Sequence, residues 1–196
     1  MRDGGAQLRP VHLVRHPLPR HAGDPFVSAP APLVTVIGIG NPYRRDDGAA
    51  GVVVRMLRER FGDDQRVRLV ELDGESVRLV QAWEGSSQVW LVDAVRSGRP
   101  PGSVHEVDAT RLADLDDSGK RLGGGHLMGL AEAVELAQAL DLLPAQLRIL
   151  GIEGVDFDHG EGLHEETALG VTLAAEQLSE SIRSALGHEE RLHLTR

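Results

Sequence analysis

Apolar residues along the chain alternate between short continuous runs and longer segments with helical spacing. The short runs predict strands, and these are Leu33–Ile37, Val67–Leu72, Gln88–Asp93, Ser103–Val107 and Leu147–Ile152. The helical spacing predicts helices at Ala49–Phe61, Ser76–Trp83, His126–Leu140 and Glu165–Leu186. Strands that alternate with helices indicate a mostly parallel sheet with helices on both faces. The run Ser103–Val107 alternates in polarity, so we expect it at an edge of the sheet.

The first 32 residues differ from the rest of the chain. They hold six of the ten prolines and three of the nine histidines, with four arginines and two aspartates. Frequent prolines without a periodic apolar pattern predict a flexible or loosely docked extension. A histidine-rich metal tract is the alternative interpretation of this segment. We therefore divide the chain into an extension (1–32), one α/β domain (33–186) and a C-terminal tail (187–196).

Composition narrows the classes of function. The chain has 196 residues, enough for one domain with a full core, and a net charge of −9. That charge argues against binding to nucleic acid and to anionic membranes, because both attract lysine and arginine. The absence of cysteine excludes disulfides, thiolate metal sites and a cysteine nucleophile, and it suits the cytoplasm. No apolar run approaches the ~18 residues of a membrane span.

Acidic and polar residues follow several predicted strands. In parallel sheets, ligands bind beyond the carboxyl ends of the strands. Crowded carboxylates repel one another unless a cation lies between them. Two carboxylates and an imidazole suit a transition metal such as nickel, zinc or iron. The residues in question are Asn41, Asp46 and Asp47 after the first strand, Asp73 after the second, Asp93 at the end of the third, and His126 before a helix.

Each of these residues also has a structural interpretation that the sequence leaves open. Asp46 or Asp47 could cap the helix that follows, and Asp73 with its glycine could form a simple turn. Asp93 could belong to a capped loop, and His126 could merely begin a helix. The acidic stretch 156–166 favours a solvated loop over a ligand set, because its spacing matches no known motif.

Five pieces of the sequence, taken in order, resemble the family of hydrogenase maturation endopeptidases. They are GIGNPYRRDDGAAG (38–51), the Asp73-Gly74 pair, VWLVDAV (89–95), the Gly-His pair at His126, and GIEG followed by GLHEE (151–166). Members of that family remove a C-terminal extension from the [NiFe]-hydrogenase large-subunit precursor after nickel insertion. The resemblance covers Leu33–Ile182. It implies a single α/β domain, phosphorylase/hydrolase-like, with a twisted, mostly parallel five-stranded sheet between helices.

The resemblance also implies roles for individual residues. Asp47, Asp93 and His126 match the metal-binding and catalytic positions of the family, and Asn41, Asp46 and Asp73 match substrate-facing positions. The implied nickel arrives with the substrate and is not a permanent cofactor, although another divalent metal could take its place in a crystal. The implied partner is the hydrogenase precursor, and the enzyme is expected to be a monomer or a weak homo-oligomer.

The chain departs from the family pattern at three positions. Glu75 replaces a second glycine after the acid-glycine pair, and Leu127 replaces a polar residue after the histidine. His164 stands before the last helix, where the family usually has serine or threonine. The three metal-binding positions are unaffected, whereas the substrate-facing details remain open.

Two other classes of protein have a similar sequence in the first loop. Peptidyl-tRNA hydrolase has a similar GLGNP sequence, but a histidine-asparagine pair follows it, and that enzyme needs a basic face for tRNA. A dinucleotide-binding module would begin with Gly38 and Gly40, but its third glycine would fall at Tyr43 and Asp47 would face a pyrophosphate. No GxSxG or HExxH motif is present.

Overall fold

The described part of the chain, residues 32–109 and 127–194 of the computed structural model, folds around one five-stranded sheet. The elements in chain order are β1 (Val34–Ile39), the 3-10 turn η1 (Arg45–Gly48), α1 (Ala49–Phe61), β2 (Val67–Leu72), α2 (Ser76–Trp83), β3 (Gln88–Val95), β4 (Val104–Asp108), α3 (Leu127–Leu140), β5 (Gln146–Glu153) and α4 (Glu165–Leu194).

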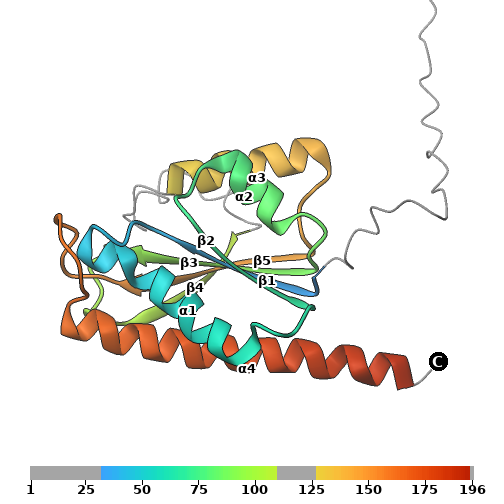
Figure 1. The fold of residues 1–196 in the computed structure, drawn as a ribbon. Coiled ribbons are helices and arrows are strands. Elements are labelled where there is room, and N and C mark those ends of the chain that lie inside the picture. Colours follow the sequence, from blue (N-terminus) through green and yellow to red (C-terminus); the bar gives the residue numbers. More distant parts are fainter. Residues whose placement is uncertain (1–31, 110–126, 195–196) are drawn as a thin grey trace, which may run out of the picture.

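The strands lie in the order β2-β1-β3-β5-β4, and only β4 runs antiparallel to its neighbour. The sheet is twisted, with α2 and α3 on one face and α1 and α4 on the other (Figure 1). The predicted fold class is therefore confirmed. The chain passes from β1 outward to β2 and then returns to β3 on the other side of β1. The carboxyl ends of β1 and β3 thus flank the point where ligands bind in sheets of this kind.

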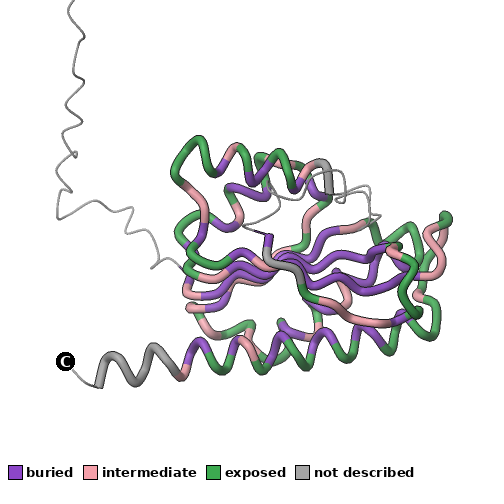
Figure 2. Tube along the Cα trace, turned by 180° about the vertical axis from the view of Figure 1, so that it is seen from behind, coloured by how far each residue is buried: buried purple, intermediate pink, exposed green. Residues whose placement is uncertain are grey.

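Aliphatic side chains fill two hydrophobic clusters, one on each face of the sheet. Val53, Val54 and Leu57 of α1 pack into the first cluster, and Trp83 of α2 packs into the second. Burial runs continuously along β1 and β3 and along the inward faces of the helices (Figure 2). Because parallel strands are covered on both faces, their sequences are apolar throughout rather than alternating.

The boundaries agree with the sequence for α1, β2 and α2, which match at both ends. β4 lies at an edge, as its alternating pattern predicts. The predicted end of the last helix at Leu186 is wrong, because α4 continues to Leu194. A helix tolerates an isolated glycine such as Gly187 at a cost of about 1 kcal/mol. Residues 1–31 and His126 lie outside the described residues, so the predictions for them remain predictions.

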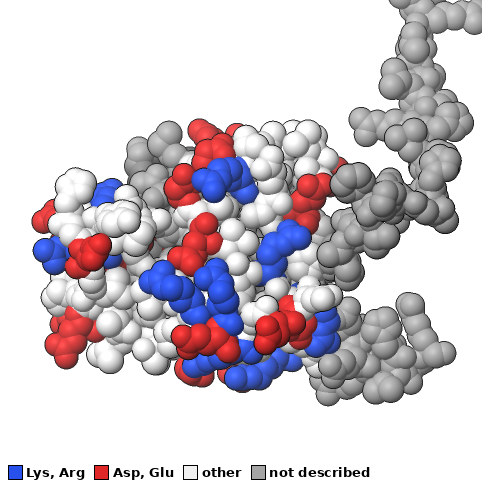
Figure 3. Space-filling view, in the orientation of Figure 1, with Lys and Arg blue, Asp and Glu red and all other residues white. Residues whose placement is uncertain are grey.

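Acidic and basic side chains lie next to one another on the surface formed by α1 and β2. Arg55 and Arg58 both contact Glu71, at 3.1 and 3.2 Å, and Arg60 joins α1 to Glu176 of α4 at 2.6 Å. Figure 3 shows the two charges interspersed over this face, without a continuous basic patch among the described residues. Within the same residues, no helix combines the length and apolar character needed to cross a bilayer.

Candidate active site at the carboxyl edge of the sheet

Asp47 and Asp93 come together at the crevice between β1 and β3. Asp93 lies opposite Ile39, the last residue of β1, and η1, which carries Asp47, packs against β3. Both aspartates are 4% exposed. The two predicted acidic ligands therefore lie near the carboxyl ends of the two central strands, Asp93 within β3 and Asp47 in the turn after β1.

The first loop holds Asp47 through its own backbone. The N–H of Asn41 donates to Oδ2 of Asp47 at 3.1 Å, and Oδ1 of Asn41 accepts from the N–H of Tyr43 at 2.9 Å. Gly40 has a φ of +150°, and a Cβ at this position would lie 1.9 Å from the carbonyl oxygen of Asp47. Only glycine fits so close an approach, so Gly40 makes room for the backbone of Asp47.

Asp46 has a different role from the one that the sequence suggested. Its side chain is fully buried. Its two oxygens accept four hydrogen bonds from residues that are 109 to 121 positions later in the chain. Oδ2 accepts from the N–H groups of Val155 and Asp156 and from the hydroxyl of Thr167, at 2.8, 2.9 and 2.9 Å. Oδ1 accepts from the N–H of His164 at 2.7 Å. With both oxygens occupied by protein donors, the geometry does not fit the expected contact with substrate.

Neither aspartate caps the helix that follows. The N-cap of α1 is Gly48, which offers no side-chain cap. Asp46 instead joins the first loop to the start of α4. Burial alone would raise the pKa of Asp46, but the hydrogen bonds from Asp156, His164, Val155 and Thr167 outweigh burial and lower the pKa below its usual value.

The acidic loop before α4 is half-buried to exposed, in agreement with the sequence-based interpretation, and it also contacts the first loop. Its backbone pairs with the first loop, because Arg45 N–H donates to the carbonyl of Gly160 at 2.9 Å and Gly160 N–H donates to the carbonyl of Tyr43 at 2.9 Å. Arg45 also forms an ion pair with Asp156 at 3.2 Å. The two loops are thus joined by backbone hydrogen bonds and an ion pair next to Asp47.

The Asp73-Gly74 pair lies in the short connection between β2 and α2, where the N–H of Glu75 donates to Oδ1 of Asp73 at 3.4 Å. Glu75, which replaces the second glycine of the family pattern, caps α2 by accepting from the N–H groups of Val77 and Arg78 at 3.1 and 3.0 Å. Asp73 is exposed and lies 3.3 Å from the guanidinium of Arg78. The sequence missed this cap because glutamate is not a typical N-cap residue.

A small hollow separates the Asp73-Gly74 connection from the first loop. Its volume is about 290 Å³, and Gly40, Gly48, Asp73 and Arg78 are among its lining residues. The start of α3 also reaches this edge, because a Cβ at Gly129 would lie 2.2 Å from the carbonyl oxygen of Gly74. The glycines permit close backbone contact, so the first loop, this connection and α3 gather around one edge of the sheet.

His126 lies outside the described residues, so its predicted role as a metal ligand stays a prediction. Within residues 32–109 and 127–194, no group of three histidine, aspartate or glutamate side chains is close enough to hold a metal ion. Asp47 and Asp93 are thus the described part of the predicted donor set.

Two further polar residues of this edge were not found from the sequence. Glu153, at the end of β5, is 2% exposed and accepts from the N–H groups of Ser97 and Gly98, both at 2.8 Å, and from the Ser97 hydroxyl at 2.7 Å. His105 of β4 has two buried ring nitrogens without a hydrogen-bond partner among the described residues. Burial, and secondarily Arg99, lowers the pKa of His105, although Glu153 opposes this. The surroundings of Glu153 and His105 depend on how β4 and β5 are aligned. No local sequence motif indicates that alignment.

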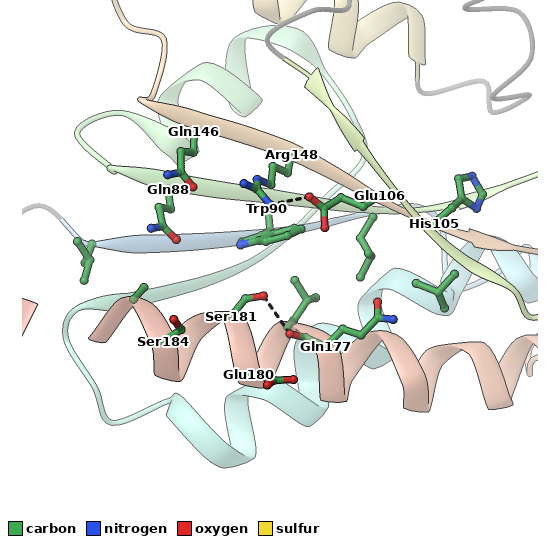
Figure 4. Close-up of a pocket in the computed structure, with 15 residues that line it drawn as sticks. Gln88, Trp90, His105, Glu106, Gln146, Arg148, Gln177, Glu180, Ser181 and Ser184 are labelled. Atoms are coloured by element: carbon green, nitrogen blue, oxygen red, sulfur yellow. Dashed lines mark hydrogen bonds and ion pairs between the residues drawn. The ribbon is translucent and has the colours of Figure 1, made fainter. Parts of the chain in front are cut away.

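A larger hollow lies elsewhere in the described structure. It has a volume of about 1040 Å³ and lies between α4 and the side of the sheet that carries Trp90 and Arg148 (Figure 4). Arg148 stacks over the Trp90 ring at 5.4 Å and pairs with Glu106 at 2.6 Å. The hollow opens near the amino ends of β1 and β3 and extends to the start of β4, where His105 is among its lining residues. Neither Asp47 nor Asp93 lines it, so size alone does not identify the reactive site.

Known proteins of one family are similar to this chain in sequence. A family model described as hydrogenase maturation protease matches residues 52–181. The hydrogenase expression/formation protein HupM of Azotobacter chroococcum mcd 1 is 28% identical over 156 residues, covering 74% of this chain and 71% of HupM. HoxM of Azotobacter vinelandii is 29% identical over 155 residues, covering 73% of this chain and 72% of HoxM.

Solved structures show the same likeness. The [NiFe] hydrogenase maturation protease HybD from Thermococcus kodakarensis has 26% identity and a TM-score of 0.63, covering 75% of this chain and 97% of that one. The hydrogenase maturating endopeptidase HybD from E. coli has 19% identity and a TM-score of 0.61, covering 78% and 93%. At that lower identity the second likeness concerns the fold alone.

Proposed function

Because this chain belongs to the family of hydrogenase maturation proteases, we propose that it removes the C-terminal extension of a nickel-loaded [NiFe]-hydrogenase large-subunit precursor. The observation that carries the proposal is the convergence of Asp47 and Asp93, each 4% exposed, on the crevice between β1 and β3. Two buried acids at a ligand-binding edge are costly unless a cation or a hydrogen-bond donor compensates their charge.

Nickel in this proposal is part of the substrate. Asp47, Asp93 and His126 would bind the nickel that the precursor already carries, since oxygen and nitrogen donors suit a borderline divalent metal. A precursor without nickel would lack this anchor, and its scissile bond would not be held against the enzyme. Metal recognition thus acts as a check that the hydrogenase is loaded before its extension is removed.

The chain of the precursor has a place to lie beside this anchor. The hollow of about 290 Å³ is lined by Asp73 and Arg78, and Asn41 is exposed next to it. Its opposite charges and exposed amide suit the backbone of a peptide better than an apolar ligand. Asn41 and Asp73 keep their proposed substrate-facing role, whereas Asp46 supports the loop from behind. We place the reaction in the cytoplasm, as the sequence predicts.

The proposal is tested by co-expressing the chain with a candidate precursor, with and without nickel, and following the precursor's mass. The wild-type enzyme should shorten the precursor only when nickel is supplied. The variants Asp47→Asn, Asp93→Asn and His126→Ala should leave it uncleaved. Asp63→Asn, in the exposed turn after α1, is the matched control and should cleave as the wild type does.

Two outcomes would count against the proposal in different ways. Normal cleavage by Asp47→Asn and Asp93→Asn would reject the crevice as the active site. Equal cleavage of nickel-free and nickel-loaded precursor would reject nickel recognition while leaving the protease activity standing.

A further inference from the structure

His105 is a half-buried residue whose imidazole makes no hydrogen bond to a described residue. Both of its ring nitrogens are shielded from solvent, and neither has a hydrogen-bond partner in the described part of the chain. An unpartnered buried polar group lowers stability, so native proteins rarely retain one unless it has another use. No hydrogen bond among the described residues accounts for a histidine at this position of β4.

Strand register places His105 in the same row as Asp93. Gly151 of β5 is the partner of Asp93 on β3 and also the partner of His105 on β4. Paired residues in a sheet project to the same face, so both side chains lie on the α2/α3 face. Two strand spacings separate their backbones, roughly 9.6 Å at ~4.8 Å per strand.

The glycine between them lets the imidazole lie toward Asp93. A Cβ at Gly151 would lie 2.9 Å from Nε2 and 3.2 Å from Cε1 of His105, so the ring occupies the space that a side chain there would need. The ring points away from α4 (Figure 4). Glycine at position 151 leaves room for this arrangement, because it has no side chain between β3 and β4.

The surroundings of His105 favour its neutral form. Burial lowers its pKa, as does the charge of Arg99 in the turn before β4, while Glu153 of β5 acts in the opposite direction. The oxygens of Glu153 already accept three hydrogen bonds from Ser97 and Gly98. A neutral imidazole has one nitrogen free to accept a proton. Asp93 is the acidic residue that is aligned with His105 across β5.

We propose that His105 is the general base of the peptide cleavage at the Asp93 site. The inference rests on the proposed function. The water oxygen bonds to the scissile carbonyl carbon while its proton moves to a ring nitrogen of His105. The carbon–nitrogen bond then breaks as that proton moves to the leaving nitrogen, which restores the neutral imidazole. His105 is not a metal ligand in this scheme, since it forms no three-residue metal group with the described acids.

The test replaces His105 with methionine, which is apolar and of similar size. His105→Met should bind Ni²⁺ as the wild type does and melt at the same or a higher temperature, because two unpartnered nitrogens are removed. Single-turnover cleavage of the nickel-loaded precursor should nevertheless slow by ~10²-fold or more. His105→Ala should regain part of its rate in added imidazole, which a merely structural residue would not show. His159→Gln, in the exposed loop before α4, is the control and should change none of these measurements.

Wild-type cleavage by His105→Met would overturn the inference, and so would a loss of cleavage that comes with weaker Ni²⁺ binding or a lower melting temperature. His105→Gln serves as the second variant if the methionine variant does not fold. Asp93→Asn separates the two proposals. If it cleaves normally, the proposed function fails, and if it is inactive while His105→Met is active, only the role of His105 fails.

Discussion

Replacing Asp46 with asparagine should destabilise the domain although the two side chains have nearly the same shape. Oδ2 of Asp46 accepts three hydrogen bonds and Oδ1 accepts one. Three of the four donors are backbone N–H groups, which cannot accept a hydrogen bond, and the fourth is the Thr167 hydroxyl, which can. An amide has only one oxygen. Its better orientation keeps that oxygen near Val155, Asp156 and Thr167, and it then turns its NH₂ group against the N–H of His164.

The size of the effect follows from these contacts. An unpartnered buried N–H costs about 1–3 kcal/mol, and the three remaining bonds weaken when their acceptor loses its charge. Removing a buried charge returns part of this loss, so we expect a net decrease of about 2–4 kcal/mol in the free energy of unfolding. At ~2–4 °C per kcal/mol for a domain of this size, the melting temperature should fall by roughly 4–16 °C.

Thermal and urea unfolding of the full chain measure this difference. Asp158→Asn is the matched control, because it makes the same substitution on the exposed part of the loop that Asp46 anchors. It should change the free energy of unfolding by less than about 0.5 kcal/mol. A melting temperature for Asp46→Asn within about 2 °C of the wild type would refute the reasoning, because the four bonds would then contribute nothing in sum.

The same residue predicts a dependence of stability on pH. The pKa of Asp46 is lower in the folded protein than in the unfolded chain, so its contribution is complete above the unfolded value of about 3.9. The contribution is lost as the pH falls through the folded-state pKa. The wild type should therefore lose more stability than Asp46→Asn between about pH 5 and pH 2. If the wild type and Asp46→Asn lost equal stability over this pH range, the pH dependence could not be assigned to Asp46.

Three further substitutions test the edge of the sheet. Gly40→Ala places a Cβ 1.9 Å from the carbonyl of Asp47, so precursor cleavage should be lost together with about 2 kcal/mol or more of stability; a wild-type cleavage rate would contradict this. Glu75→Ala removes the cap of α2 and should cost about 1 kcal/mol in urea unfolding, whereas cleavage of the precursor should continue. Glu153→Ala leaves the N–H groups of Ser97 and Gly98 without their acceptor and should cost about 1–3 kcal/mol, which an unchanged urea midpoint would disprove.

Much of the fold could be predicted from the sequence, because its strands and helices have strong local patterns. The continuous apolar run of β3 and the helical spacing of α1 each reflect burial against neighbouring layers, which a single segment already shows. The end of α4 was the main error, since helix length beyond a glycine depends on packing and not on the local residue. The family resemblance was confirmed by the match to residues 52–181.

The candidate site was predictable in part. Asp47 and Asp93 were found because acids after parallel strands meet at one edge of the sheet whatever the details of packing. Glu75 and His105 were missed for different reasons. Glutamate is an unusual cap, and the importance of His105 depends on its being aligned with Asp93 across a third strand.

The sequence by itself determined the order of strands and helices and the chemical types gathered at the carboxyl edge, because periodicity and residue type are local properties. Only the tertiary structure decided what the adjacent acids Asp46 and Asp47 do. The partners of Asp46 lie 109 to 121 positions further along the chain, where the loop before α4 folds back onto the first loop. Hydrogen bonds to such distant groups bury Asp46 as a support and leave Asp47 at the crevice.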